Sequence, residues 1–269
     1  MKVLYSYCKY NPLVLKEIII ALQAYKNAYE FIKSNKLFKW IITPGIFYSI
    51  LFGVSMYFFA HTSNNFIAWL NLKTGLKTWL EKKAEMGEWW GFFFTTSSFS
   101  LWLVMMLFYF SLFKYFILIT GSPIFAYLSE KTIAIIERKD LSFNITQLQS
   151  DVWRGIRIAL INLLRQSVYM IALGFASIVP VLGLIAVVVA LIVESYYFGF
   201  SMLDYSINRQ GKKIAESAFF IGDHKGLAIG NGVVFYTMHW IPVIGWIFAP
   251  VYAIIAATLI LYPVRKGSN

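Results

Sequence analysis

Four long stretches without Asp, Glu, Lys or Arg constrain this chain more than any other feature. They cover residues 40–72, 89–113, 166–193 and 226–264. A bilayer core about 30 Å thick is crossed by about 20 apolar helical residues, so each stretch is long enough to enter a membrane. Because 59% of the residues are apolar and only 14% are charged, too few charges are available to cover a water-facing surface. The composition excludes a soluble globular domain and predicts one integral membrane domain over residues 1–269.

The first two stretches predict full transmembrane helices at residues 40–61 and 99–120. The second helix contains one charged residue, Lys114, which makes it a candidate for lining a transport pathway. The alternative is that Lys114 snorkels to the headgroups, because it lies within about two turns of the helix end. Glu194, at the end of the third stretch, is expected to be an interfacial carboxylate paired with Lys or Arg.

The last two stretches are too long for one straight span, and each contains a Pro-Gly break near its middle. Residues 166–193 would extend about 42 Å as one helix, and residues 226–264 about 58 Å. The breaks share the pattern Pro-Val-x-Gly, at Pro180–Gly183 and at Pro242–Gly245, which is a short internal repeat. Proline removes a helix donor and glycine permits a tight turn, so both breaks predict an interrupted helix.

Two interpretations of the breaks stay open. One is a pair of hemi-penetrating helical hairpins at residues 167–197 and 232–261, with arms of about 20 Å around the first break. The other is a single span kinked at proline. In the hairpin interpretation a helix begins at Leu184 with free N–H groups inside the membrane, and helix N-termini bind anions. This predicts an anion-compatible site at Pro180, Gly183 and Leu184, with Pro242 and Gly245 at the second tip.

Two further segments are expected at the membrane interface. Residues 13–38 place apolar side chains at helical spacing between lysines and predict an amphipathic helix, and residues 141–165 form a second polar segment. Residues 1–39 carry seven Lys against two Glu, whereas residues 62–98 carry four Lys and three Glu. The positive-inside rule therefore predicts a multi-pass protein with both termini in the cytoplasm.

Catalytic signals are absent from the sequence. Its three histidines have no metal-ligand spacing, and it contains neither a phosphate-binding loop nor a nucleophile elbow. We expect no enzymatic activity, no metal and no cofactor. The net charge of +11 comes from basic residues between the apolar runs, which indicates contacts with membrane lipids rather than with nucleic acid. Hairpin tips that lipid cannot satisfy predict a homo-oligomer in which a neighbouring subunit covers them.

Several short segments carry a family resemblance: Leu203–Tyr205, Arg209, Glu216, Pro250–Ala253, Ala256–Thr258, Gly121–Ile124 and Leu128–Lys131. Together they resemble the CysZ-like sulfate permeases, which belong with the etoposide-induced membrane proteins of eukaryotes. The resemblance covers about Leu22 to Leu261. It implies an inner-membrane homo-oligomer with two long spanning helices and two hemi-penetrating hairpins, which passes sulfate inward.

The resemblance also points to a site before the first long helix. In that family a Gly-Leu-Arg that contacts sulfate precedes the helix, whereas the matching residues here are Lys36, Leu37 and Phe38. Lys36 and Lys39 therefore supply the basic groups at this position, either for an anion or for phosphate headgroups. Two functions stay open. One is a permease for sulfate or a related oxyanion, and the other is a non-transport scaffold that organises membranes or handles lipids.

Overall fold

The computed structural model describes residues 13–74, 88–139, 145–177, 179–208, 211–241 and 243–266. All regular structure in these residues is α-helical. Five of the helices contain segments long and apolar enough to cross a membrane: Gly45–Thr62, Trp102–Thr120, Gln149–Ala176, Leu182–Asn208 and Ile244–Tyr262. The chain is therefore an all-α membrane protein, as its composition predicts.

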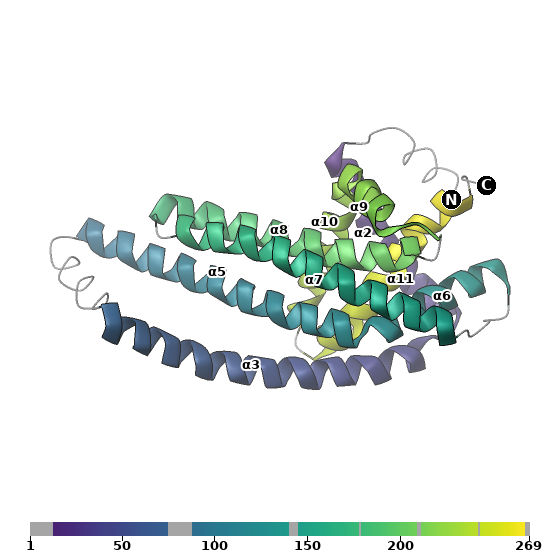
Figure 1. The fold of residues 1–269 in the computed structure, drawn as a ribbon, viewed down its shortest axis with the longest axis horizontal. Coiled ribbons are helices and arrows are strands. Elements are labelled where there is room, and N and C mark those ends of the chain that lie inside the picture. Colours follow the sequence, from purple (N-terminus) through teal and green to yellow (C-terminus); the bar gives the residue numbers. More distant parts are fainter. Residues whose placement is uncertain are drawn as a thin grey trace.

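Helices α3 (Phe38–Thr74) and α5 (Glu88–Thr120) contain the two predicted spans and run antiparallel along the long axis of the molecule (Figure 1). Both are longer than predicted, with 37 and 33 residues. The sequence has neither proline nor glycine between residues 54 and 74, so nothing in it ends α3 at residue 61. The two helices therefore extend beyond the segments chosen by hydropathy alone.

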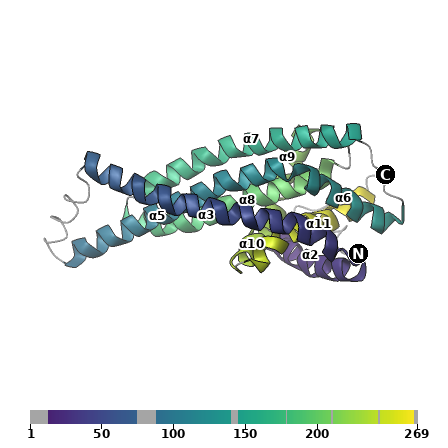
Figure 2. The same ribbon diagram turned by 90° about the horizontal axis from the view of Figure 1, so that it is seen from below.

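The first Pro-Gly break is a reversal of the chain between α7 (Ile145–Ala176) and α8 (Pro180–Asn208), which lie side by side in Figures 1 and 2. A continuous, kinked helix is therefore wrong for this segment. The predicted arm length of about 20 Å is also wrong, because helices of 32 and 29 residues extend about 48 and 44 Å. Residues 145–165, expected as part of a separate interfacial segment, continue without interruption into the first arm.

The tip of this hairpin packs against α5. A Cβ atom added at Gly183 would lie 3.0 Å from the Ser100 Cβ atom and 2.9 Å from the Ser177 carbonyl oxygen, so glycine permits the close contact. Ser100 lies just beyond the apolar segment Trp102–Thr120. The α7–α8 hairpin therefore reaches the far end of the α5 span.

The second break is also a reversal of the chain, between α10 (Lys225–His239) and α11 (Ile244–Lys266), and Pro242 lies outside the described residues. A Cβ atom at Gly245 would lie 1.8 Å from the Met238 carbonyl oxygen, so only glycine fits this turn. Helix α10 has 15 residues, or about 22 Å, which is too short to cross a bilayer core. The tip lies near the middle of the long axis in Figures 1 and 2.

Three shorter helices gather at one end of the molecule: α2 (Val14–Ser34), α6 (Ser122–Glu137) and α9 (Ile214–Asp223) (Figure 1). Helix α2 corresponds to the amphipathic helix predicted at 13–38, although it ends at Ser34. One face is buried against α10 and α11 through small side chains such as Ala21, Ala24 and Ala28. A second apolar row, Leu15, Ile19, Leu22 and Tyr29, is exposed and suits a membrane surface.

Helix α2 is joined to the C-terminal half by polar contacts as well. The Glu17 carboxylate accepts a hydrogen bond from the backbone N–H of Gly226 at 2.8 Å, and its other oxygen lies 2.6 Å from His224 Nδ1. This carboxylate therefore caps the N-terminus of α10. The Tyr25 hydroxyl donates to the Asn231 carbonyl oxygen at 2.8 Å, and burial raises the pKa of Tyr25 so that it stays a neutral donor.

Helices α8 and α10 approach most closely at two glycines. A Cβ atom at Gly199 would lie 1.9 Å from the Ala228 carbonyl oxygen, and one at Gly232 would lie 2.0 Å from the Ser195 carbonyl oxygen. The rings of Phe198 and Phe235 stack beside them, with centroids 3.7 Å apart. Backbone contact therefore sets the position of α10 against α8, which holds one side of the site described next.

Candidate functional site

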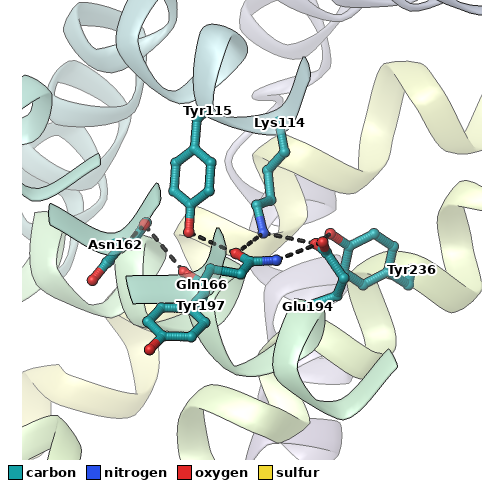
Figure 3. Close-up of polar contacts among 8 residues, drawn as sticks. Lys114, Tyr115, Asn162, Gln166, Glu194, Tyr197 and Tyr236 are labelled. Atoms are coloured by element: carbon teal, nitrogen blue, oxygen red, sulfur yellow. Dashed lines mark hydrogen bonds and ion pairs between the residues drawn. The ribbon is translucent and has the colours of Figure 1, made fainter. Parts of the chain in front are cut away.

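Five polar side chains from four helices meet in the interior (Figure 3). Lys114 and Tyr115 come from α5, Gln166 from α7, Glu194 from α8 and Tyr236 from α10. Lys114 is 6% exposed and Glu194 is 1% exposed. We refer to these five residues as the Lys114–Glu194 cluster.

The Glu194 carboxylate is the centre of the cluster. One of its oxygens accepts from Lys114 Nζ at 2.7 Å and from the Tyr236 hydroxyl at 2.9 Å, and the other accepts from Gln166 Nε2 at 2.5 Å. The Gln166 carbonyl oxygen in turn accepts from Lys114 Nζ at 2.8 Å and from the Tyr115 hydroxyl at 2.7 Å. Opposite charges, together with hydrogen bonds to both Glu194 oxygens and two from Lys114 Nζ, make burial of this ion pair tolerable.

The cluster lies inside the apolar region of its helices. Lys114 is six residues, or about 9 Å, from the Thr120 end of the α5 span, and Glu194 is twelve residues, or about 18 Å, from Leu182. The alternative that Lys114 snorkels to the headgroups is wrong, because its ammonium group points inward to Gln166 and Glu194 (Figure 3). Glu194 is paired with a lysine as expected, but it is buried rather than interfacial.

A second polar feature is a cleft of about 650 Å³ between α7 and α9. Basic side chains on its wall are Arg154, Arg157, Arg165 and Lys213, and we call it the basic cleft. The buried Asn162, whose side-chain amide donates to the Ser201 hydroxyl at 3.4 Å, also lines it. Because Asn162 and Gln166 are one helical turn apart on α7, the basic cleft lies next to the Lys114–Glu194 cluster.

Several residues from the short segments that resemble the family connect the helices around the basic cleft. Asp204 accepts from Arg154 Nη2 at 2.9 Å and from the Ser217 hydroxyl, so it connects α8 with α7 and α9. The Tyr205 hydroxyl donates to the Leu118 carbonyl oxygen of α5 at 2.9 Å. Glu216 accepts from the backbone N–H of Lys213 at 3.1 Å and caps α9. These contacts connect neighbouring helices or cap α9, which is a structural role. Arg209 lies outside the described residues.

The structure does not bring the predicted anion-site residues together. Lys36 is exposed at the junction of α2 and α3, and Lys39 is in the first turn of α3. Helix α8 begins at Pro180, at the opposite end of the molecule in Figures 1 and 2, because proline fits the first turn of a helix. The prediction that a helix begins at Leu184 with free N–H groups is therefore wrong, since the exposed Leu184 is the fifth residue of α8.

The second tip has an apolar environment. Gly245 is buried in the turn, and the neighbouring Trp246 donates its ring N–H to the His239 carbonyl oxygen at 3.0 Å. The Phe52 ring lies 4.5 Å from the His239 ring and 4.7 Å from the Trp246 ring, centroid to centroid. Aromatic packing, rather than a row of hydrogen-bond donors, surrounds this tip.

Sequence reasoning missed Gln166, Tyr115 and Tyr236 as members of the Lys114–Glu194 cluster. A polar side chain at the start of a charge-free stretch was one available signal for Gln166. No signal in the sequence pointed to Tyr115 or Tyr236. The chain contains 17 tyrosines, and tyrosine in membrane proteins is usually found in the aromatic belts at the membrane interfaces.

Comparison with known proteins gives one assignment. No individual curated protein matches the chain. The family described as Sulfate transporter CysZ/Etoposide-induced protein 2.4 matches over residues 24–250, which include α5, α7, α8 and α10 and hence all four helices of the Lys114–Glu194 cluster. The match covers most of the chain and confirms the resemblance to this family. The chain is therefore a member of the CysZ/etoposide-induced protein 2.4 family of membrane proteins.

Proposed function

We propose that the protein conducts a small oxyanion, sulfate or a related dianion, through the inner membrane, and that the Lys114–Glu194 cluster lies on its path. The description of the family supports sulfate as the cargo. One observation carries the proposal: three hydrogen-bond donors surround a single carboxylate inside the apolar region. Burying an ionisable group inside a membrane costs free energy, so such groups are rare and usually belong to substrate or ion pathways.

A carboxylate and a sulfate ion present the same kind of acceptor oxygen. The Lys114 ammonium, the Gln166 amide and the Tyr236 hydroxyl, which now hold Glu194, are donors that an oxyanion could use in the same way. Because Glu194 already occupies these donors and repels a second anion, cargo can pass only when that carboxylate moves aside. In this proposal the described arrangement is the closed state of the path.

The proposal extends to the setting of the protein. In this proposal the protein acts as a permease, which moves its cargo without a catalytic step, and not as an enzyme. The charge distribution supports cytoplasmic termini, and α10, which is too short to cross a bilayer core, supports a homo-oligomer in which a second subunit lies against the α10–α11 tip.

Uptake of labelled sulfate into proteoliposomes tests the proposal. Wild type should exceed protein-free vesicles, and Lys114→Met should lower uptake at least about tenfold, because the cationic donor is lost. Lys114→Met/Glu194→Gln, which leaves no buried charge, separates a folding defect from a transport defect, since it should fold like wild type and still transport poorly. Lys26→Gln on the exposed face of α2 is the control for loss of one positive charge.

Two results would refute the proposal. Wild-type uptake no faster than leakage into empty vesicles would remove the permease function. Normal uptake by a well-folded Lys114→Met variant would remove the cluster from the path.

A further inference from the structure

The basic cleft combines positive charge with apolar walls at the surface of the helix bundle. We propose that it binds the phosphate group of an anionic phospholipid, with the lipid's glycerol and upper acyl chains against the apolar wall. This binding site lies next to the proposed path, and lipid binding there does not depend on transport.

Positive charge in the cleft is largely uncompensated. Arg154 is paired with Asp204 at 2.9 Å, which leaves Arg157, Arg165 and Lys213 as cations on the wall. No carboxylate lies among the described residues that line the cleft. Arg157 and Arg165 are eight residues apart, or about 12 Å along one side of α7, so their flexible side chains can converge on one phosphate from two sides.

The first turn of α9 faces the same space. Ile214 and Ala215 line the cleft, and α9 has 10 residues. Its positive N-terminal end therefore adds to the field of the three cations. Glu216 is occupied at this end by the Lys213 backbone N–H, and it is not part of the cleft wall.

The apolar part of the wall favours a lipid over a free ion. Trp153, Ile158, Ile161 and Phe200 line the cleft beside the cations, and Trp153 is 73% exposed. A free sulfate or phosphate ion gains nothing from such a wall, whereas a headgroup attached to acyl chains buries apolar surface against it. Tryptophan next to arginine is typical of the headgroup level of a membrane.

The position of the cleft along the helices also fits the headgroup level. Gln166 contacts Tyr115, so Arg165 lies within about two turns of Thr120, where the α5 span ends. Beyond Arg165 the exposed side chains of α7 are apolar, as at Val168 and Ile171. Basic pockets between membrane helices at this level bind lipid phosphates, each basic residue contributing about fivefold to binding.

Native mass spectrometry of the detergent-purified full chain tests the proposal. Delipidated protein is incubated with equal amounts of dioleoyl-phosphatidylglycerol and dioleoyl-phosphatidylcholine, which have identical acyl chains but differ in headgroup charge. Wild type should retain phosphatidylglycerol at least about tenfold better. Arg157→Gln/Arg165→Gln should lower this retention about 30-fold, since two cations are removed.

Two matched variants control the experiment. Lys26→Gln/Lys33→Gln removes the same charge from exposed positions of α2 and should leave retention unchanged. Arg157→Lys/Arg165→Lys keeps the charge and should lower retention less than about threefold, which separates charge from any effect on folding. Equal retention of both lipids by wild type, or wild-type retention by the Gln variant, would overturn the proposal. Displacement of phosphatidylglycerol by sulfate but not by chloride at matched ionic strength would overturn the lipid assignment in favour of a free oxyanion.

Discussion

Replacing Gly232 by alanine should force α10 away from α8 and destabilise the protein. The new Cβ atom would lie 2.0 Å from the Ser195 carbonyl oxygen and 2.5 Å from the Ser195 carbonyl carbon, whereas ordinary contact begins at 3.4 Å. The helices must therefore separate by about 1.4 Å, because backbone atoms cannot rotate aside as a side chain can. Overpacking of this kind costs about 1–3 kcal/mol, and the rigid neighbour places the cost near 3 kcal/mol.

The readout is thermal unfolding in detergent, together with sulfate uptake. A loss of about 3 kcal/mol lowers the midpoint by roughly 6–12 °C for a chain of this size. Sulfate uptake should change as well, because the Lys114–Glu194 cluster lies on the proposed path. Glu194 adjoins Ser195 and Tyr236 lies one turn after Gly232, so the 2.9 Å hydrogen bond between Tyr236 and Glu194 would lengthen. Gly222→Ala in α9 is the control, since a Cβ atom there meets nothing within 4 Å and should be neutral or slightly stabilising. Equal midpoints for Gly232→Ala and wild type would refute the reasoning.

Three further predictions concern the buried ion pair, the topology and the assembly. Lys114→Met or Glu194→Gln alone should lower the free energy of unfolding by about 3–5 kcal/mol, because one charge is left buried without its partner. The double variant Lys114→Met/Glu194→Met should recover most of this loss. Equal losses in all three variants would contradict the pairing. In a Cys8→Ala background, cysteines at Lys139 and Lys212 should react with an impermeant thiol reagent from the same side of the membrane, and labelling from opposite sides would exclude the hairpin. Size-exclusion chromatography with light scattering should give a homo-oligomer, and a single monomeric species in both mild detergent and nanodiscs would contradict it.

The positions of the chain reversals could be predicted from the sequence because their causes are local. Proline interrupts helical hydrogen bonding and glycine permits close backbone contact, so each Pro-Val-x-Gly motif marks the place where one helix gives way to the next. The lengths of the arms could not be predicted in the same way. Charges at Asp151 and Arg154 made the segment before residue 166 resemble an interfacial segment, yet their partners Asn208 and Asp204 come from α8. Only the tertiary structure supplies those partners.

The candidate site was partly predictable for a similar reason. Lys114 and Glu194 each stand out as charges at the edge of apolar sequence, and each was singled out separately. Their pairing spans 80 residues and depends on the packing of α5 against α8. Gln166 completes the pair from a third helix, and an uncharged side chain gives no sign in the sequence of which ions it will contact.

The contact between Glu17 and the start of α10 sets an order for biosynthesis. Its partner His224 follows 207 residues later, so at about 5–20 residues per second the ribosome needs roughly 10–40 s to make the surface on which α2 docks. During that interval α2 has only the membrane surface for its apolar rows, and the Glu17 carboxylate must stay in contact with water or lipid headgroups. Among the described helices α2 leaves the ribosome first, yet it is among the last to reach its native position, because it can dock only after the α10–α11 hairpin has entered the membrane.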